Sequence, residues 1–545
     1  MNPTSNGSAP KLDAVEELDV LIVGAGFAGL YQLMQLRDLG FKVRVYDNAA
    51  QIGGIWYWNC YPGARVDSTC PLYQFSREDL WKDWEYSELF PAWTEIREYF
   101  KYVDQKLNLS KDVQLNTRIE SATFDQDKNQ WVIKTDTGTT VRARYFIICT
   151  GFASKPLIPE IEGFDTFAGP VAHAGRWPQE ELDFSGKRIG VIGTGSSGVQ
   201  LAEQASLKAK HLTVFQRTPA LALPLRQVKL DQEAQQKMKK NYPEIMKLRG
   251  TSFAGFDYEF LAKSWYDCTP EERQATFEQV WGEGAFHPWL GTFRETLVDE
   301  EANEAAYVFW RNKVHARVKD PKIAEKLAPA KKPIYYGTKR MGLEQWYYEI
   351  FNQDNVELVD LKDDPIVRVT PKGIQTKNKF HELDMILLGT GFDAVTGGVP
   401  SIDIHGIEGK TLAQYWDKGF RTAYGTASAG FPNLFFVYGP QSPAAVANGP
   451  SLAEHQGKLV VACIKYMRDK KLNRINATPE AEAYWLEKVK AVSSPSLLSR
   501  TRSWWFGGNI AGRELESLYF LGGLPMFLEE CWNSANKDYE GFRLS

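Results

Sequence analysis

The chain has 545 residues, of which 43% are hydrophobic and 24% charged, so it is long enough for two or three domains with cores of their own. Its net charge is -4, and no block of Lys or Arg interleaved with aromatic residues occurs, so we expect no nucleic-acid partner. No apolar run approaches the roughly 18 residues that span a bilayer, and we expect a cytoplasmic protein without a membrane partner.

Residues 2–7 lack a basic and then apolar targeting pattern, and we expect roughly a dozen N-terminal residues to be mobile. The cysteines include no C-x-x-C pair, which excludes a zinc knuckle and a redox-active dithiol. We expect no bound metal and six free, mostly buried thiols, at Cys60, Cys70, Cys149, Cys268, Cys463 and Cys531.

The first predicted unit is a strand, a helix and a second strand, joined at a glycine-rich turn. An apolar strand at residues 18–23 is followed by Gly24, Gly26 and Gly29, a helical pattern to residue 39, a strand at 42–46 and Asp47. Such glycines let a pyrophosphate approach the helix N-terminus, and an acid about 20 positions later accepts from a ribose. We therefore expect a dinucleotide with a free ribose, as in FAD, rather than a turn without a ligand.

A second unit of the same kind begins at residues 188–192. It predicts phosphate contacts in the following turn and helix, at Gly193, Thr194, Gly195, Ser196, Ser197, Gly198 and Gln200. The next strand, at 212–216, ends in Arg217 and Thr218 in place of an acid. An acid would repel a 2′-phosphate, whereas a guanidinium binds it bidentately, so we expect NADPH here. The alternative for Arg217 is an ordinary surface charge.

Helical periodicity replaces these units between residues 223 and 333, where Ala302, Ala306, Phe309, Trp310 and Val314 lie mostly three or four positions apart. Strands at 145–149 and 384–388 end in Thr-Gly and Gly-Thr-Gly, which we interpret as crossing points between domains. The sequence therefore predicts an α/β fold with two Rossmann-like dinucleotide-binding domains, for FAD and NADP, and a helical insertion in the NADP domain. The expected parts are 1–151 and 389–545 for FAD, 152–222 and 334–388 for NADP, and 223–333 for the insertion. Two dinucleotides imply hydride transfer between them.

Two longer gapped patterns accompany these units. The first, F-x-G-x-x-x-H-x-x-x-W-P, consists of Phe167, Gly169, His173, Trp177 and Pro178. The second, G-G-x-W-x-x-x-x-Y-P-G-x-x-x-D, consists of Gly53, Gly54, Trp56, Tyr61, Pro62, Gly63 and Asp67. With both patterns in this order, the chain resembles the type I Baeyer–Villiger monooxygenases, which are class B flavoprotein monooxygenases, over nearly its whole length.

The resemblance implies that NADPH reduces FAD and that O2 then gives a flavin peroxide anion. This anion would attack a ketone and form a Criegee-type adduct, which becomes an ester or lactone. The resemblance also marks Arg340 as the catalytic cation and Asp67 as its counter-charge. An arginine suits this role because it stays charged when buried, whereas a lysine could lose its proton. The alternative for the pair is a purely structural ion pair.

The same resemblance assigns further expected roles. Besides the two glycine-rich units, the cofactor contacts are Gly54, Trp56, Asp67, Tyr73, Lys339, Asp393, Gln441 and Trp504. Lys339 would join Arg217 on the 2′-phosphate, and residues 439–443 would lie beside the flavin ring. Trp504, in a loop with Ser503, Trp505 and Asn509, would cover the nicotinamide side of the cleft. The substrate pocket would be lined by Ala444, Ala445, Val446 and Trp504.

The first pattern is expected to be structural: Phe167, Gly169, His173 and Trp177 would brace the linker between the domains. Three positions depart from the family. Thr69 stands where a glutamate is common, and Cys60 and Gly508 replace the commoner Arg and Ala, so we expect the finer shape of the pockets to differ from that of relatives.

Two other functions remain alternatives. A flavin monooxygenase that oxygenates amines or sulfides through a neutral flavin hydroperoxide shares both nucleotide units, but its fingerprint closes with Tyr or Phe rather than Trp177 and Pro178. The second alternative is a flavin-binding redox sensor without turnover. Among ketones we expect aliphatic or small cyclic ones as substrates, and we expect the protein to be a monomer.

Overall fold

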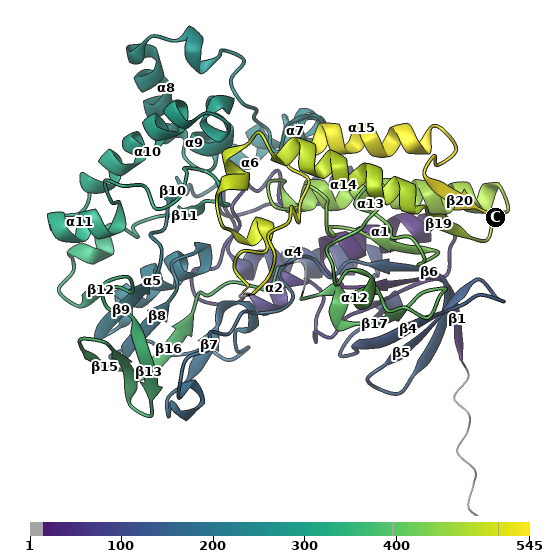
Figure 1. Ribbon diagram of the computed structural model, residues 1–545, viewed down its shortest axis with the longest axis horizontal. Helices are drawn as coiled ribbons and strands as arrows, with labels where there is room; N and C mark the ends of the chain where they lie inside the picture. The colour runs from purple at the N-terminus through teal and green to yellow at the C-terminus, as the bar shows by residue number, and fades with distance from the viewer. Residues whose placement is uncertain (1–14, 395–396, 511) are drawn as a thin grey trace, which may run out of the picture.

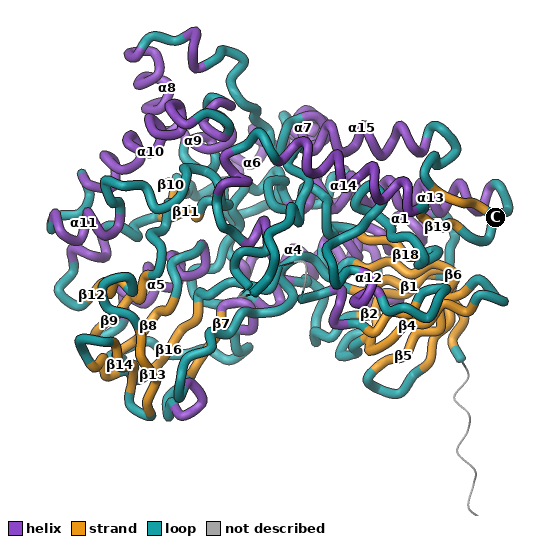
Figure 2. Tube along the Cα trace, viewed as in Figure 1, coloured by secondary structure: helices purple, strands orange, loops and turns teal. Residues whose placement is uncertain are grey.

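The computed structural model describes residues 15–394, 397–510 and 512–545 (Figure 1). The mobile N-terminus expected from the sequence lies outside these residues. Two groups of strands lie at opposite sides of the molecule, and helices cover them. Loops fill much of the space between the two groups (Figure 2). None of the helices within the described ranges combines the length and apolar character needed to cross a bilayer.

The larger sheet contains the first glycine-rich unit. Its order is β17-β4-β5-β6-β1-β2-β3, and β18 also pairs with β6. Its strands are β1 (Glu16–Val23), β2 (Val43–Tyr46), β3 (Val113–Gln114), β4 (Ile119–Asp125), β5 (Gln130–Thr135), β6 (Thr140–Ile148), β17 (Asp403–His405) and β18 (Leu434–Phe436). Because β17 and β18 follow the second unit in the chain, the larger sheet takes strands from both ends of the sequence.

The second sheet contains the second glycine-rich unit and is parallel throughout, in the order β12-β9-β8-β16-β7. Its strands are β7 (Val171–His173), β8 (Arg188–Ile192), β9 (His211–Gln216), β12 (Val356–Asp360) and β16 (Met385–Leu388). Parallel strands buried on both faces read as continuous apolar runs, which is why β8 and β16 were visible in the sequence. The mixed α/β fold with two dinucleotide-binding units is confirmed.

A glycine is required at the same place in both units. Gly24 follows β1, and a Cβ atom there would lie 2.5 Å from the carbonyl oxygen of Cys149, at the end of β6. Gly193 follows β8, and its Cβ would lie 2.6 Å from the carbonyl oxygen of Gly389, after β16. Both residues also have positive φ, 105° and 97°. Each glycine-rich turn therefore passes close to the neighbouring crossing strand, which leaves no room for a side chain.

Helices α1 (Phe27–Asp38) and α5 (Ser196–Lys208) follow the two turns. The other helices are α2 (Ile55–Trp58), α3 (Glu78–Trp81), α4 (Trp93–Leu107), α6 (Gln232–Lys239), α7 (Tyr242–Thr251), α8 (Pro270–Glu283), α9 (His287–Leu290), α10 (Glu300–His315), α11 (Pro321–Leu327), α12 (Leu412–Tyr415), α13 (Gly449–Asp469), α14 (Pro479–Ser493) and α15 (Leu524–Ala535). Within residues 223–333, α7 contacts α13 and α15, whereas α8–α11 extend toward the second sheet (Figure 1).

Three small sheets complete the described structure. Their strands are β10 (Ala222–Pro224) and β11 (Gly342–Glu344), β13 (Ile366–Thr370), β14 (Gly373–Thr376) and β15 (Phe380–Glu382), and β19 (Ile475–Ala477) and β20 (Phe542–Leu544). The first pair joins the two ends of the helical region, because β10 precedes it and β11 follows it. None of these three sheets was predicted from the sequence.

Candidate active site

Arg340 and Asp67, predicted from separate motifs, form an ion pair. Arg340 Nε donates to Asp67 Oδ2 over 2.8 Å, although 273 positions separate them in the chain. Arg340 Nη1 faces the carbonyl oxygens of residues 445, 446 and 447 at 3.2, 3.4 and 3.5 Å. The guanidinium also lies over the ring of Phe286, 5.1 Å from its centre. These contacts fix the guanidinium on two sides, and Nη2 has no hydrogen-bond partner among the described residues.

The surroundings keep Arg340 charged. Burial alone would lower the pKa of Arg340, but the carboxylate of Asp67 outweighs this effect and raises the pKa above its ordinary value. Burial raises the pKa of Tyr438 to about 12 and also raises the pKa of Tyr73, both near the ion pair. These phenols therefore stay neutral, and the site offers a permanent cation in a largely uncharged aromatic setting.

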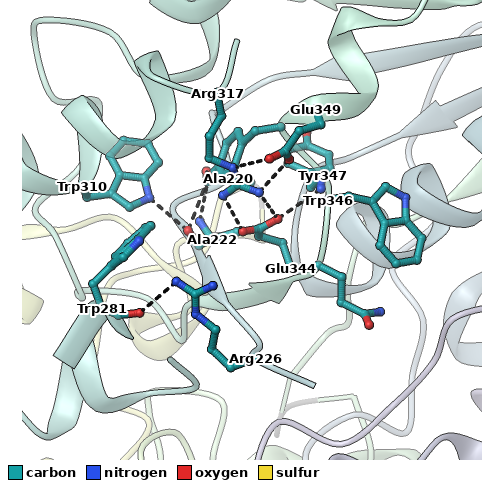
Figure 3. A network of polar contacts seen from close by, with 12 residues as sticks. Ala220, Ala222, Arg226, Trp281, Trp310, Arg317, Glu344, Trp346, Tyr347 and Glu349 are labelled. Atoms are coloured by element: carbon teal, nitrogen blue, oxygen red, sulfur yellow. Dashed lines mark hydrogen bonds and ion pairs between the residues drawn. The ribbon is translucent and has the colours of Figure 1, made fainter. Parts of the chain in front are cut away.

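The segment after Arg340 is held by three carboxylates, of which Glu203 and Glu344 are buried. Arg317 makes a double hydrogen bond to Glu344, at 2.7 and 2.9 Å, and a second one to Glu349 (Figure 3). Glu203, on α5, accepts from the backbone N–H groups of residues 345 and 346 at 2.6 and 3.0 Å. Burial raises the pKa of Glu203 to about 8 although both donors oppose this. Arg340 thus begins a segment that is tied to the helix of the second glycine-rich turn.

The first glycine-rich turn forms a bare backbone cradle. A Cβ atom on Gly54 would lie 2.8 Å from Cα of Gly26, so the loop that contains Gly54 touches the first glycine-rich turn. Gly29 lies one helical turn further on, in α1. Asp47 accepts from the backbone N–H groups of Ala25 and Ala49 at 2.6 and 2.8 Å. Because each carboxylate oxygen has a second lone pair, Asp47 can also accept from a ribose.

Trp56 and Tyr73 lie beside this cradle. Trp56 Nε1 donates to Tyr73 Oη over 3.1 Å, and the two rings meet edge to face. A site with exposed backbone at a helix N-terminus and aromatic walls fits a flavin dinucleotide.

The second glycine-rich turn is contacted by the second gapped pattern. Tyr61 Oη lies 3.1 Å from Ser197 Oγ and donates to Gln200 Oε1 over 2.7 Å. A Cβ atom on Gly63 would lie 2.7 Å from the side chain of Gln204, so this glycine lets the loop approach α5. Thr194 Oγ1 donates to the carbonyl oxygen of Thr218 over 2.7 Å. The structure thus brings the two nucleotide units into direct contact, which sequence analysis had missed.

The positive charges of Lys339 and Arg217 act on each other. Burial, and then the charge of Arg217, lowers the pKa of Lys339. Neither side chain makes an ion pair within the described part of the chain. Gly195, at the N-cap of α5, has open space where a Cβ atom would project. Two interacting cations without a protein anion fit a phosphorylated ribose, and the open N-terminus of α5 fits a pyrophosphate.

The first gapped pattern packs between the two units. His173 is 5% exposed, and its Nδ1 accepts from the backbone N–H of Gly175 over 2.9 Å. The backbone N–H of Trp177 donates to the carbonyl oxygen of Trp58 over 3.1 Å. Phe167 packs in the core of the second sheet, and a Cβ atom on Gly169 would lie 2.4 Å from the carbonyl oxygen of Asp384.

Acid should weaken the fold through His173. Burial lowers the pKa of His173 from 6.5 to about 4, so the unfolded chain takes up a proton before the folded one does. The contribution of His173 to the free energy of unfolding is therefore fully present above about pH 6.5. It falls, by up to about 3 kcal/mol, as the pH drops toward 4. The variant His173→Asn keeps an acceptor for Gly175 but cannot titrate. Urea unfolding at several pH values should show a smaller acid loss for this variant; an unchanged loss would contradict the assignment. His455, whose pKa burial lowers to about 3, contributes equally to both proteins.

The loop that contains Trp504 packs against the residues around Arg340. Trp504 stacks on Phe152, with ring centres 5.5 Å apart and an angle of 8°, and Phe152 stacks in turn on Tyr438. Thr501 Oγ1 donates to Thr338 Oγ1 over 2.8 Å, and Thr338 directly precedes Lys339 and Arg340 in the chain. Asn509 Nδ2 donates to the carbonyl oxygen of Phe392 over 2.9 Å. Ser503 caps the short helix that contains Trp504 and Trp505.

The remaining predicted residues, in the segment that leads to the carbonyls of 445–447, are buried. Ala444, Ala445 and Val446 are at most 2% exposed. Gln441 is fully buried, and its side chain is bonded to Thr422 and to the carbonyl oxygen of Phe420. Its backbone is engaged as well: the N–H donates to the carbonyl oxygen of Leu518 over 2.8 Å, and the carbonyl oxygen accepts from Trp485 Nε1 over 3.2 Å. Contact of Gln441 with a cofactor therefore stays a prediction.

Asp393 follows the second crossing point in the chain, and Lys155 follows the first. The two side chains form an ion pair, with Lys155 Nζ 3.2 Å from Asp393 Oδ2.

Comparisons with known proteins agree with this site. A model of the pyridine nucleotide-disulphide oxidoreductase family matches residues 18–257. The chain is 50% identical to a cyclopentanone 1,2-monooxygenase from Comamonas sp. (strain NCIMB 9872), over 97% of this chain and 96% of that protein. It is 36% identical to a Baeyer-Villiger monooxygenase from Pseudooceanicola batsensis, over 93% of each. The solved structure of OTEMO in complex with FAD and NADP superimposes with a TM-score of 0.93, at 35% identity, over 97% of this chain and 99% of that one. Together with the Arg340–Asp67 pair between two dinucleotide cradles, these similarities show that the chain belongs to the Baeyer–Villiger monooxygenases.

Proposed function

We propose that this FAD- and NADPH-dependent ketone monooxygenase acts on small cyclic or aliphatic ketones, with Arg340 and Asp67 as its catalytic groups. The main support is the ion pair itself. Arg340 is a permanent cation that a carboxylate and three carbonyls fix through Nε and Nη1, so that its Nη2 can donate to a ligand. The relative named for cyclopentanone, which is 50% identical over almost the whole chain, supports the substrate class.

The two cradles would hold the cofactors. Gly24, Gly26, Gly54 and Asp47 would bind FAD, and the turn at residues 193–198 would bind NADPH, with Lys339 and Arg217 on its 2′-phosphate. When bound and reduced by NADPH, FAD supplies the activation of O2. The protein's part is to bring both cofactors together, and the Tyr61 contacts with α5 support such a coupling.

Arg340 would stabilise the negative charge that develops on oxygen as the ketone is oxygenated. A preorganised donor costs no reorganisation at the moment of reaction and acts more strongly where water is excluded. Asp67 would orient the guanidinium and balance its charge, which avoids an unpaired cation in a buried site. The ordered Trp504 stack would shield this region from water.

A panel of ketones tests the substrate class. Purified enzyme should oxidise NADPH faster when cyclopentanone or another small ketone is added, and mass spectrometry should find the ester or lactone. Activity on steroid ketones alone would contradict the proposal. Amines and sulfides belong in the panel, since N- or S-oxygenation without ester formation would favour the alternative mechanism. The monomeric state and the cytoplasmic location remain predictions, which size-exclusion chromatography and cell fractionation check.

A further inference from the structure

The two segments that hold Arg340 are also joined to each other. Asn448 follows the carbonyls of residues 445–447, and Ser68 follows Asp67. Asn448 Nδ2 donates to Ser68 Oγ over 2.8 Å, and the two residues are 0% and 2% exposed. The contacts therefore form a closed ring: Arg340 bridges the two segments on one side, and the Asn448–Ser68 hydrogen bond bridges them on the other.

We propose that Asn448 is a positioning residue, which sets the spacing between Asp67 and the carbonyls that orient Arg340. This inference rests on the proposed role of Arg340. The distances from Nη1 to the three carbonyls, 3.2–3.5 Å, lie at the long end of hydrogen-bond geometry. Such contacts are weak one by one, so the orientation of the guanidinium depends on how the two segments are spaced.

Asn448 is itself fixed by further hydrogen bonds. Its Oδ1 accepts from the backbone N–H of Ser451 over 3.0 Å and from Ser451 Oγ over 2.7 Å, which caps α13. Its backbone N–H donates to the carbonyl oxygen of Ala254 over 2.7 Å. Because both ends of the amide are engaged, the side chain cannot rotate without breaking a buried hydrogen bond.

The ring is anchored to the helical region through Arg249. This residue, on α7, is 1% exposed, and its Nε donates to Ser451 Oγ over 2.9 Å. Nη1 donates to the carbonyl oxygen of Gln74 over 3.2 Å, and Nη2 lies 3.7 Å from Glu454 Oε2. Glu454 Oε1 in turn accepts from the backbone N–H of Ser76. Helix α7 therefore braces both the start of α13 and the segment that follows Asp67.

Two substitutions remove the bridge with little change elsewhere. Ser68→Ala deletes the acceptor, and Asn448→Ser deletes the amide donor but keeps an oxygen, on a shorter side chain, that can cap α13. We expect either variant to lower kcat/KM for the ketone by roughly 10- to 100-fold, the usual cost of losing a supporting hydrogen bond or misplacing a reacting group by about 1 Å. The KM for NADPH should stay within about twofold, since Lys339 and Arg217 are untouched.

Ser428→Ala is the matched control. Ser428 is also fully buried, and its Oγ donates to the carbonyl oxygen of Arg421 over 2.6 Å, outside the ring. Hydrogen–deuterium exchange of the FAD-bound enzyme without ketone supplies a second readout. Backbone amides of residues 444–448 should exchange faster in Ser68→Ala than in the wild type, and should be unchanged in Ser428→Ala.

A double-mutant cycle completes the test. If the two side chains act through one hydrogen bond, Ser68→Ala with Asn448→Ser should be no slower than the worse single variant. Full ketone activity in both single variants, or an equal loss in Ser428→Ala, would overturn the positioning role. Arg340→Ala, measured in parallel, separates the two claims. If Arg340→Ala is slow while Ser68→Ala and Asn448→Ser stay fast, only the positioning role fails; if Arg340→Ala also stays fast, the role of Arg340 fails and the positioning role fails with it.

Discussion

Arg340→Ala is expected to lower kcat/KM for lactone formation from cyclopentanone by roughly two to three orders of magnitude or more, the typical cost of losing one preorganised donor to a developing oxyanion. Among the described residues, Asp67 forms its ion pair with Arg340 and with no other cation, so no second side chain is placed to take over. Steady-state assays with product quantified by gas chromatography make the comparison. Loss of the side chain should leave NADPH binding close to that of the wild type.

Two further variants control this result. Arg340→Lys keeps a positive charge but not the planar fork, so it cannot contact Asp67 and the carbonyls of 445–447 together and should recover only a small part of the activity. Asp67→Ala removes the counter-charge and should also weaken turnover. If the lysine variant were as fast as the wild type, charge alone would explain the role of Arg340, and the fixed orientation would be irrelevant.

The second large effect is expected on the choice of nicotinamide. Replacing both Lys339 and Arg217 with alanine removes the two cations assigned to the 2′-phosphate. Hydrogen bonds to a charged group are worth about 1.5–3 kcal/mol each, so KM for NADPH should rise by roughly 100-fold or more. KM for NADH, which lacks this phosphate, should change little. Initial rates at varied NADPH and NADH give both values.

Lys210→Ala is the control for the lost charge. Lys210 is exposed and directly precedes β9, whereas Arg217 directly follows it, so the two residues lie at opposite ends of one strand. This variant should bind NADPH as the wild type does. An equal rise in KM for both nicotinamides in the double variant would contradict the assignment of the two cations to the 2′-phosphate.

The two nucleotide units could be predicted from the sequence because their signals are local. Buried parallel strands give continuous apolar runs, and the turns require glycine where a side chain would meet the backbone, as at Gly24 and Gly193. The sheet of β13–β15 was missed because its strands have three to five residues and expose part of their surface. Short, half-exposed strands carry too little periodicity to be recognised.

Most of the site could not be derived from local patterns. Arg340 and Asp67 are 273 residues apart, and only the resemblance to a family paired them before the structure did. Phe286 under Arg340, the Phe152–Tyr438 stack and Asn448 lie in no motif. Each is defined by a contact between distant segments, which a single sequence does not record.

The three departures from the family have local structural settings. Cys60 Sγ lies 3.8 and 3.6 Å from the carbonyl oxygens of Trp177 and Pro178, where the first gapped pattern ends. The hydroxyl of Thr69 is buried without a partner among the described residues. At Gly508 a Cβ atom would lie 2.5 Å from the side chain of Arg502, so an alanine would require that arginine to move.

The most direct test of the role of Arg340 is the amount of lactone formed per NADPH consumed in Arg340→Ala. If Arg340 acts on oxygenation and not on the reduction of FAD, the variant should still oxidise NADPH but release hydrogen peroxide in place of lactone. The wild type should form close to one lactone for each NADPH. A variant that keeps this ratio, at a rate near that of the wild type, would contradict the account.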